Sequence, residues 1–168
     1  MLGILYAVHL QDYEAAAEYL EHAVRVDPSD GQANYHYGWL LAFKLNREYE
    51  RARRHIARAV QNAPQDAQIQ KTYADLFWEK MNDYPRARRE YQKCLEQFST
   101  QYTPQILAMI HCGYAGTLMI AGENTLAESH FRQALSLDPE NEDISVMYAG
   151  CLQKNGKDLD KAEEYLFC

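Results

Sequence analysis

The stretch Asp83–Ser99, DYPRARREYQKCLEQFS, has the features of an α-helix that packs closely against a neighbouring helix. Asp83 is a favourable N-cap, and Pro85 lies in the first turn, where a missing N–H costs little. Ala87, Tyr91 and Cys94 follow at spacings of four and three residues, which places them on one helix face. Two small side chains flanking an aromatic one predict close contact with another helix.

The same face recurs along the chain. Pairs of small residues seven positions apart are Ala16/Ala23, Ala52/Ala59, Ala87/Cys94 and Ala127/Ala134, and Ala162 begins a fifth pair. The first members of these pairs are 36, 35, 40 and 35 residues apart, and a large apolar side chain lies within each pair. From the second unit on, another helix precedes each such helix. It carries an aromatic residue followed directly by a small residue, as in Tyr37-Gly38. This repetition predicts a series of antiparallel helix pairs.

The expected helices follow from these faces and from their start and stop signals. They lie at about 2–9 and 12–26, 31–45 and 48–62, 67–81 and 84–98, 104–121 and 124–136, and 140–154 and 158–167.

Three blocks carry a resemblance to a known family: EAAAEYLEHAVRVDP at 14–28, RARRHIARAVQNAP at 51–64 and LAESHFRQALSLDP at 126–139. They resemble the second helix and closing proline of the tetratricopeptide repeat. The resemblance implies an all-α, right-handed α-solenoid forming one domain over residues 1–168. Its repeats would span about 1–30, 31–66, 67–103, 104–139 and, in part, 140–168. The incomplete first and last repeats favour a segment of a longer array, or ends that associate with another chain.

Composition limits the other possibilities. Hydrophobic residues make up 47% of the 168 and charged residues 24%, which is typical of a globular chain. No apolar run is long enough to span a membrane, and the first residues lack a basic leader. The four cysteines form no CxxC motif or disulfide-like pattern. We therefore expect an intracellular, cytoplasmic protein with no membrane partner.

The sequence carries no motif of a catalytic, metal or cofactor site. It contains no GxGxxG, P-loop, GxSxG or HExxH pattern, and no two of its six histidines are at i, i+4 on one expected helix. Surface or half-buried histidines are the favoured interpretation. We expect no catalytic residues, no metal and no cofactor, and a protein that is not an enzyme. An enzyme subunit's helical domain is a competing class.

The family resemblance implies that the first helix of each repeat faces a concave groove that binds a peptide or partner helix. The matching positions are Tyr35, His36, Trp39 and Phe43, then Lys71, Asp75 and Trp78, then Met109 and Cys112, and finally Met147. For the two tryptophans, burial between repeats is an equal alternative. The charged clamp by which some relatives hold a chaperone's terminal carboxylate is absent, since none of its matching positions is charged.

A second hypothesis uses the basic middle of the chain. Residues 44–93 hold 12 of the 17 lysines and arginines against seven acidic residues, although the whole chain has a net charge of −7. The possible basic face comprises Arg47, Arg51, Arg54, Arg58, Arg86 and Arg89. The stretch RARREYQKCLEQF at 86–98 also resembles half-a-tetratricopeptide repeats of RNA-processing factors. An adaptor for RNA or an acidic protein is thus the alternative to a groove-binding scaffold, while an ordinary solvated face is the simplest reading. The overall negative charge disfavours nucleic acid as a partner.

Overall fold

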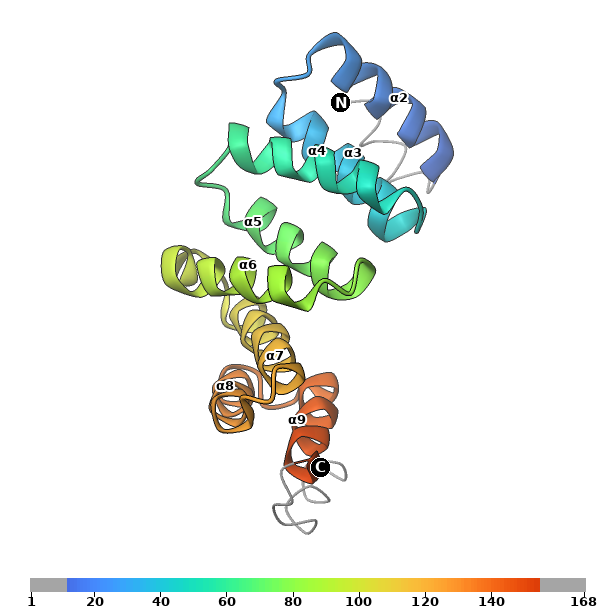
Figure 1. Cartoon of the computed structure of the whole chain (residues 1–168). Helices are drawn as coiled ribbons and strands as arrows, with labels where there is room; N and C mark the ends of the chain where they lie inside the picture. The colour runs from blue at the N-terminus through green and yellow to red at the C-terminus, as the bar shows by residue number, and fades with distance from the viewer. Residues whose placement is uncertain (1–11, 155–168) are drawn as a thin grey trace. The chain divides into compact units, whose positions relative to one another are not determined.

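The computed structural model describes residues 12–154, and α-helices make up most of this part of the chain (Figure 1). In chain order the α-helices are α2 (Tyr13–Val26), α3 (Gly31–Trp39), α4 (Tyr49–Asn62), α5 (Ala67–Asp75), α6 (Tyr84–Gln97), α7 (Pro104–Ile120), α8 (Asn124–Leu137) and α9 (Glu142–Lys154). Two π-helical turns, η2 (Leu40–Lys44) and η3 (Leu76–Lys80), extend α3 and α5, and a short 3₁₀ turn, η4 (Ser99–Gln101), follows α6. The predicted helices between residues 12 and 154 are confirmed, whereas those at 2–9 and 158–167 lie outside the described residues.

The helix starts are fixed by short polar side chains. Asp30 accepts a hydrogen bond from Ala33 N at 3.0 Å, and Asp83 accepts one from Arg86 N at 3.2 Å. Each bond satisfies an amide that has no partner within its own helix. The predicted N-cap Asp83 and the first-turn proline of α6 are confirmed. Thr103 caps α7 in the same way, and Pro104 is the first residue of that helix.

Extra residues between the helices of the second and third repeats are absorbed by the two π-turns. Leu45 N donates to Leu40 O at 3.0 Å, and Met81 N donates to Leu76 O at 3.1 Å, so each bond spans five residues rather than four. The chain then passes through left-handed backbone, at Asn46 with φ 48° after η2 and at Asn82 with φ 52° after η3. Asparagine tolerates this conformation better than most residues. The wider turn thus ends each first helix without a long loop.

The chain divides into two compact units, Met1–Asn82 and Asp83–Cys168, called here the N-unit and the C-unit. In the described part of the N-unit, α3 packs against both α2 and α4, and α4 also contacts α5. Its core contains Leu20 of α2, Tyr37 and Leu40 of the second repeat, and Ile56 of α4, each at most 6% exposed. Aromatic and aliphatic side chains between neighbouring helices therefore hold this unit together.

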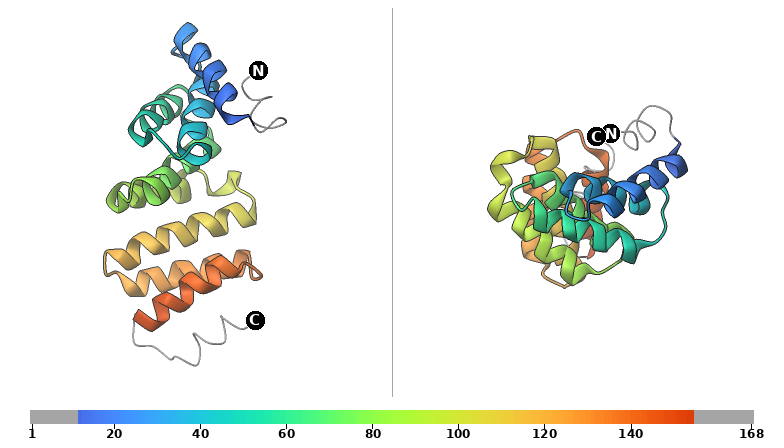
Figure 2. Two further views of the ribbon diagram at one scale, coloured as in Figure 1. Left: turned by 90° about the vertical axis from the view of Figure 1, so that its right-hand side faces the viewer. Right: turned by 90° about the horizontal axis from the view of Figure 1, so that it is seen from above.

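In the C-unit, α7 lies between α6 and α8, and α9 packs mainly on α8 (Figure 2). Phe131 of α8 and Ile144 and Tyr148 of α9 are buried between these helices. The predicted small residues of the second helices, Ala87 and Cys94, are fully buried. A larger side chain at such a position would overfill the contact at a cost of about 1–3 kcal/mol. The division into units does not test the predicted single domain, which stays a prediction.

Candidate interaction surfaces and polar clusters

The first helices of the second and third repeats, α3–η2 and α5–η3, carry predicted groove residues of the N-unit, and their surface is called here the first-helix face. The Tyr35 hydroxyl is 3.5 Å from Thr72 Oγ1 on the neighbouring first helix. The Tyr35 ring packs against His36, with 5.0 Å between the centroids. Lys71 donates to Asp75 at 2.6 Å, and both side chains are largely shielded from solvent. The face is thus lined by half-buried rings and one internal ion pair.

Two lysines cover the aromatic side chains at the other end of this face. Lys44 Nζ lies 5.4 Å from the centroid of the Trp39 ring and 5.7 Å from that of Tyr13, and Lys80 Nζ lies 5.4 Å from that of Phe43. Such contacts are attractive because the ring face is electron-rich. Trp39 and Phe43 also pack against the core of the N-unit and are only half-buried. They therefore contribute both to the core and to the surface.

The predicted groove residues of the C-unit lie on α7 and α9, where Cys112 is buried. The Cys112 thiol contacts Met147 Sδ at 3.4 Å, and Met109 is 45% exposed. Burial raises the pKa of the Cys112 thiol to about 12, so this sulfur stays protonated and is a poor nucleophile. The sulfur-containing side chains make this a polarizable apolar surface.

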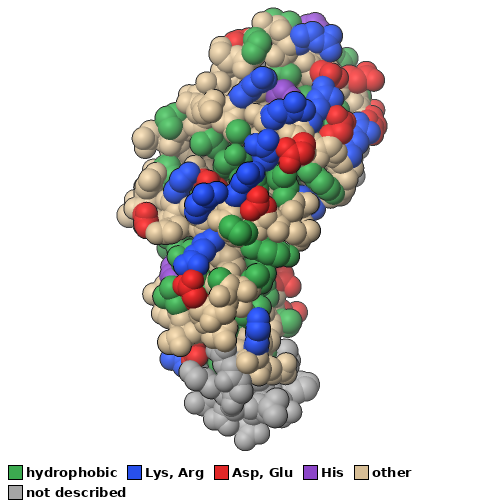
Figure 3. Space-filling model, viewed as in Figure 1, with side chains coloured by type: hydrophobic (Ala, Val, Ile, Leu, Met, Phe, Trp, Pro, Cys, Tyr) green, Lys and Arg blue, Asp and Glu red, His purple; other side chains and the backbone are tan. Residues whose placement is uncertain are grey.

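Two of the four N-unit arginines of the possible basic face are paired with carboxylates. Arg47 binds Glu14 through two hydrogen bonds of 2.9 and 2.7 Å, and Arg51 binds Glu48 at 3.0 Å. Figure 3 shows acidic side chains next to basic ones over much of the displayed face.

Among the other predicted arginines, Arg86 pairs with Asp83 at 3.2 Å in the C-unit. Arg54, Arg58 and Arg89 are exposed and form no ion pair within residues 12–154. Half of the six arginines are therefore occupied by carboxylates.

A buried polar cluster joins α3 to α4 in the N-unit. The fully buried Asn34 donates through Nδ2 to Pro28 O at 3.0 Å and to Asp30 O at 2.8 Å. Its Oδ1 lies 2.8 Å from His55 Nδ1 and must accept, so that nitrogen carries the imidazole proton. Burial and the neighbouring arginines lower the pKa of His55 to about 4, which keeps the ring neutral at pH 7.

A histidine pair joins α7 to α8 in the C-unit. His111 Nδ1 and His130 Nδ1 are 2.9 Å apart, with 5.2 Å between the ring centroids and an interplanar angle of 25°. The Tyr114 and His130 rings pack edge to face, with 4.8 Å between their centroids. Burial lowers the pKa of both imidazoles, that of His111 to about 4. No sequence pattern predicts this pair, because the two residues lie on different helices, 19 positions apart.

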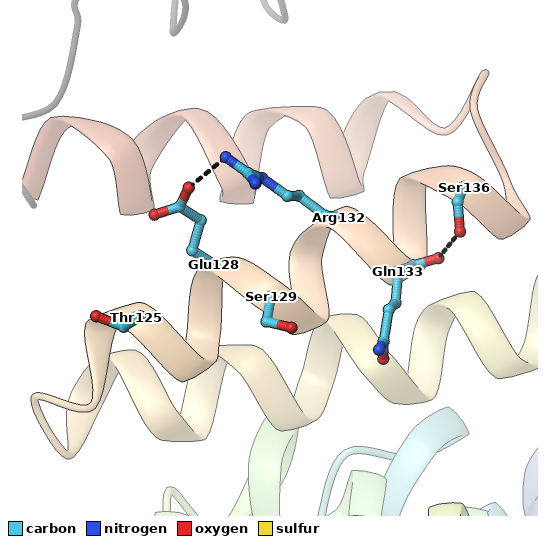
Figure 4. Close-up of a pocket in the computed structure, with 6 residues that line it drawn as sticks. All are labelled: Thr125, Glu128, Ser129, Arg132, Gln133 and Ser136. Carbon is cyan, nitrogen blue, oxygen red and sulfur yellow. Dashed lines mark hydrogen bonds and ion pairs between the residues drawn. The ribbon is translucent and has the colours of Figure 1, made fainter.

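The outer face of α8 carries a polar hollow of about 550 Å³ (Figure 4). Its lining residues follow helical spacing along this single helix: Thr125, Glu128, Ser129, Arg132, Gln133 and Ser136. The buried Glu128 is held by Arg132 at 2.6 Å, and Arg132 Nε also donates to the Tyr148 hydroxyl of α9 at 3.0 Å. The two charged residues that line the hollow, Glu128 and Arg132, therefore already have partners on α8 and α9. No nucleophile–base pair is found among the side chains that line the hollow.

No three histidine, cysteine or acidic side chains between residues 12 and 154 converge as a metal-binding group. None of the helices in that range is both long and apolar enough to cross a membrane.

Family profiles of the tetratricopeptide repeat match residues 3–67, 40–102 and 118–167. A comparison with curated proteins found no match.

Similar solved structures include MamA, with a TM-score of 0.82 and 13% identity over 99% of this chain and 91% of that one. PilF of Pseudomonas aeruginosa has a TM-score of 0.79 and 19% identity over 98% of this chain and 70% of that one. YrrB, described as a TPR protein with an unusual peptide-binding site, has a TM-score of 0.77 and 17% identity over 97% of this chain and 78% of that one. These matches confirm the predicted all-α solenoid class. Since the repeat profiles cover most of its length, the chain belongs to the tetratricopeptide-repeat family.

Proposed function

We propose that the chain is a non-catalytic scaffold that binds a peptide or partner helix on the first-helix face of its N-unit. The observation that carries the proposal is the convergence of Tyr35, His36 and Thr72 from α3 and α5 beside the Lys71–Asp75 ion pair. Half-buried aromatic rings with polar tips supply contact area at a low entropic cost. YrrB, which shares the fold, is described as having a peptide-binding site.

The same face offers more than one kind of contact. Tyr35 and His36 present ring surface, and burial lowers the pKa of His36, so its imidazole is neutral at pH 7. Lys71 and Asp75 already satisfy each other and can bind a partner without leaving an unpaired charge. An extended segment with apolar side chains and free backbone groups suits this mixture.

The test uses peptides selected from a random library displayed on phage, with affinities measured by fluorescence anisotropy. Tyr35→Ala combined with His36→Ala should weaken binding at least ~10-fold, because aromatic anchors dominate such interfaces. Trp39 and Phe43 are left in place, since their packing against the core would mix a loss of stability with a loss of binding.

The matched control is Arg54→Glu with Arg58→Glu on α4, two exposed positions that form no ion pair in the described chain. On the proposed function this variant binds like the wild type. Loss of binding in the arginine variant alone, with a steep dependence on salt, would instead support the basic-face adaptor. If no peptide binds, or if both variants bind normally, the first-helix face is not the binding site.

A further inference from the structure

The histidine pair of the C-unit forms a hydrogen bond between two ring nitrogens, His111 Nδ1 and His130 Nδ1. A neutral imidazole has one N–H and one lone pair, so a 2.9 Å contact between two Nδ1 atoms needs a proton on one of them and a lone pair on the other. The two rings come from different helices, which fixes their separation through the packing of α7 on α8. Both side chains are only half-buried and therefore remain within reach of solvent.

The 2.9 Å between the two Nδ1 atoms fits a right angle at a metal ion better than a tetrahedral angle. Metal–imidazole bonds are about 2.0–2.1 Å long, so two nitrogens at a right angle on one ion are about 2.9 Å apart. A tetrahedral ion such as Zn²⁺ needs roughly 3.3 Å between them, whereas right angles are typical of square-planar or tetragonal Cu²⁺ and Ni²⁺.

We propose that His111 and His130 form a two-nitrogen site for a divalent transition-metal ion with tetragonal geometry, Ni²⁺ or Cu²⁺. The ion would replace the shared Nδ1 proton, with water in its remaining positions. Each ring turns by about 45° so that its lone pair points to a common centre instead of to the other ring. The proton displaced from one Nδ1 is taken up at Nε2 of the same ring, so the pair changes tautomer without losing a proton.

The surroundings of the pair favour metal binding at neutral pH. Because burial lowers the pKa of both rings, protons do not compete for the lone pairs at pH 7. Arg88 of α6 interacts with the hydroxyl of Tyr114, whose ring packs against His130. The charge of Arg88 is balanced by Glu123, with bonds of 2.6 and 3.0 Å. Among residues 12–154 two side chains form this group, so we expect the site to be weaker than a closed structural zinc site.

The experiment titrates Ni²⁺ into the full chain without an affinity tag at pH 7.5, with the thiols kept reduced, and follows binding by calorimetry and by thermal unfolding. We expect one Ni²⁺ per chain and a rise in the melting temperature that grows with Ni²⁺ concentration. Mg²⁺, which prefers oxygen ligands, should produce neither effect, and Zn²⁺ should bind more weakly than Ni²⁺.

The variants His111→Gln and His130→Gln should each weaken Ni²⁺ binding at least ~10-fold, because one remaining imidazole cannot chelate. Glutamine can still form a hydrogen bond with the other histidine, and circular dichroism verifies that each variant is folded. His22→Gln, at an exposed position on α2, is the matched control and should bind like the wild type. Normal binding by either pair variant, or no binding by the wild type at millimolar Ni²⁺, would overturn the proposal.

Discussion

The N-unit and the C-unit both bury neutral histidines between the helices of a repeat, but they give these rings different partners. His55 donates to Asn34, an amide that does not titrate and that also holds the carbonyls of residues 28 and 30. His111 meets His130, a group that can exchange its own proton. The first arrangement fixes a loop in one geometry, whereas the second leaves a site whose proton can move.

The units also differ in how closely their first helices are approached. A Cβ added at Gly38 of α3 would lie 2.6 Å from Ile56 Cγ1 and 2.8 Å from the backbone oxygen of Ala52. A Cβ added at Gly113 of α7 would lie 2.6–2.8 Å from the end of the Tyr91 ring. A backbone oxygen is among the obstacles in the N-unit, while in the C-unit the nearest atoms all belong to the Tyr91 side chain.

These differences can be followed one unit at a time, because both tryptophans of the chain, Trp39 and Trp78, belong to the N-unit. Tryptophan fluorescence therefore reports the unfolding of the N-unit, and circular dichroism reports all helices. If the two transitions coincide, the chain unfolds as the single domain predicted from its sequence; separate transitions would contradict that prediction.

The largest expected effect is that of Asn34→Ala. This variant removes the acceptor of His55 and the donors to two loop carbonyls, and it leaves those groups buried or poorly paired. We expect a loss of about 3–4 kcal/mol in the free energy of unfolding, measured by urea denaturation with tryptophan fluorescence. Asn124→Ala in the C-unit tests the comparison, since the Asn124 side-chain oxygen has no hydrogen-bond partner in the described structure. An equal loss from both variants would show that the His55 cluster is not special.

Gly38→Ala should be next, with a loss of about 2–3 kcal/mol in the stability of the N-unit. Alanine favours a helix by about 1 kcal/mol over glycine, but the new methyl group cannot pass the Ala52 carbonyl unless α3 and α4 separate. The same denaturation experiment measures the effect. Adding Ile56→Val should restore little stability, because the backbone oxygen remains in place. Full rescue by Ile56→Val would show that only the side chain restricts this contact.

The contribution of His55 to the pH dependence of stability should be smaller than the effects of these two substitutions. The pKa of His55 is about 4 in the folded chain and near 6.5 when unfolded, so the unfolded state binds the proton more readily. Stability is therefore fully present above about pH 6.5 and declines as the pH falls towards 4. We expect a loss on the order of 1–2 kcal/mol from this ring, once solvent screening is allowed for. Because carboxyl groups also titrate near pH 4, the measurement is the difference between the wild type and His55→Gln in fluorescence-monitored unfolding. A difference that does not change with pH would contradict a neutral, buried His55.

The sequence predicted those features that depend on local spacing. The small residues Ala52 and Ala87, the N-cap Asp83 and the first-turn Pro85 all follow from patterns within one helix, and the structure confirms each of them. The π-turns η2 and η3, which absorb extra residues before α4 and α6, were not predicted. A single inserted residue can enter either a loop or a helix, and the packing of the neighbouring helices decides which.

The polar clusters could not be predicted, because they depend on how one helix is placed against the next. The contact between His111 and His130 needs a particular offset of α8 along α7, which no spacing within either helix specifies. The groove residues were identified only through the family resemblance. The structure brings Tyr35 next to Thr72 and Cys112 next to Met147, but these two contacts lie in different units. Their role in binding stays a prediction.

The smallest effect should be that of Gly113→Ala, and it tests the difference in backbone approach most directly. The gain in helix propensity opposes the cost of moving the Tyr91 ring, so we expect a net loss of about 1 kcal/mol or less in unfolding followed by circular dichroism. Tyr91→Leu removes the ring atoms that the new methyl group would meet. The double variant should therefore be more stable than the sum of the two single effects allows, by about 1 kcal/mol in a double-mutant cycle. Additive effects would mean that the helices, rather than the Tyr91 ring, move to admit the methyl group, and that both units pack their first helices in the same way.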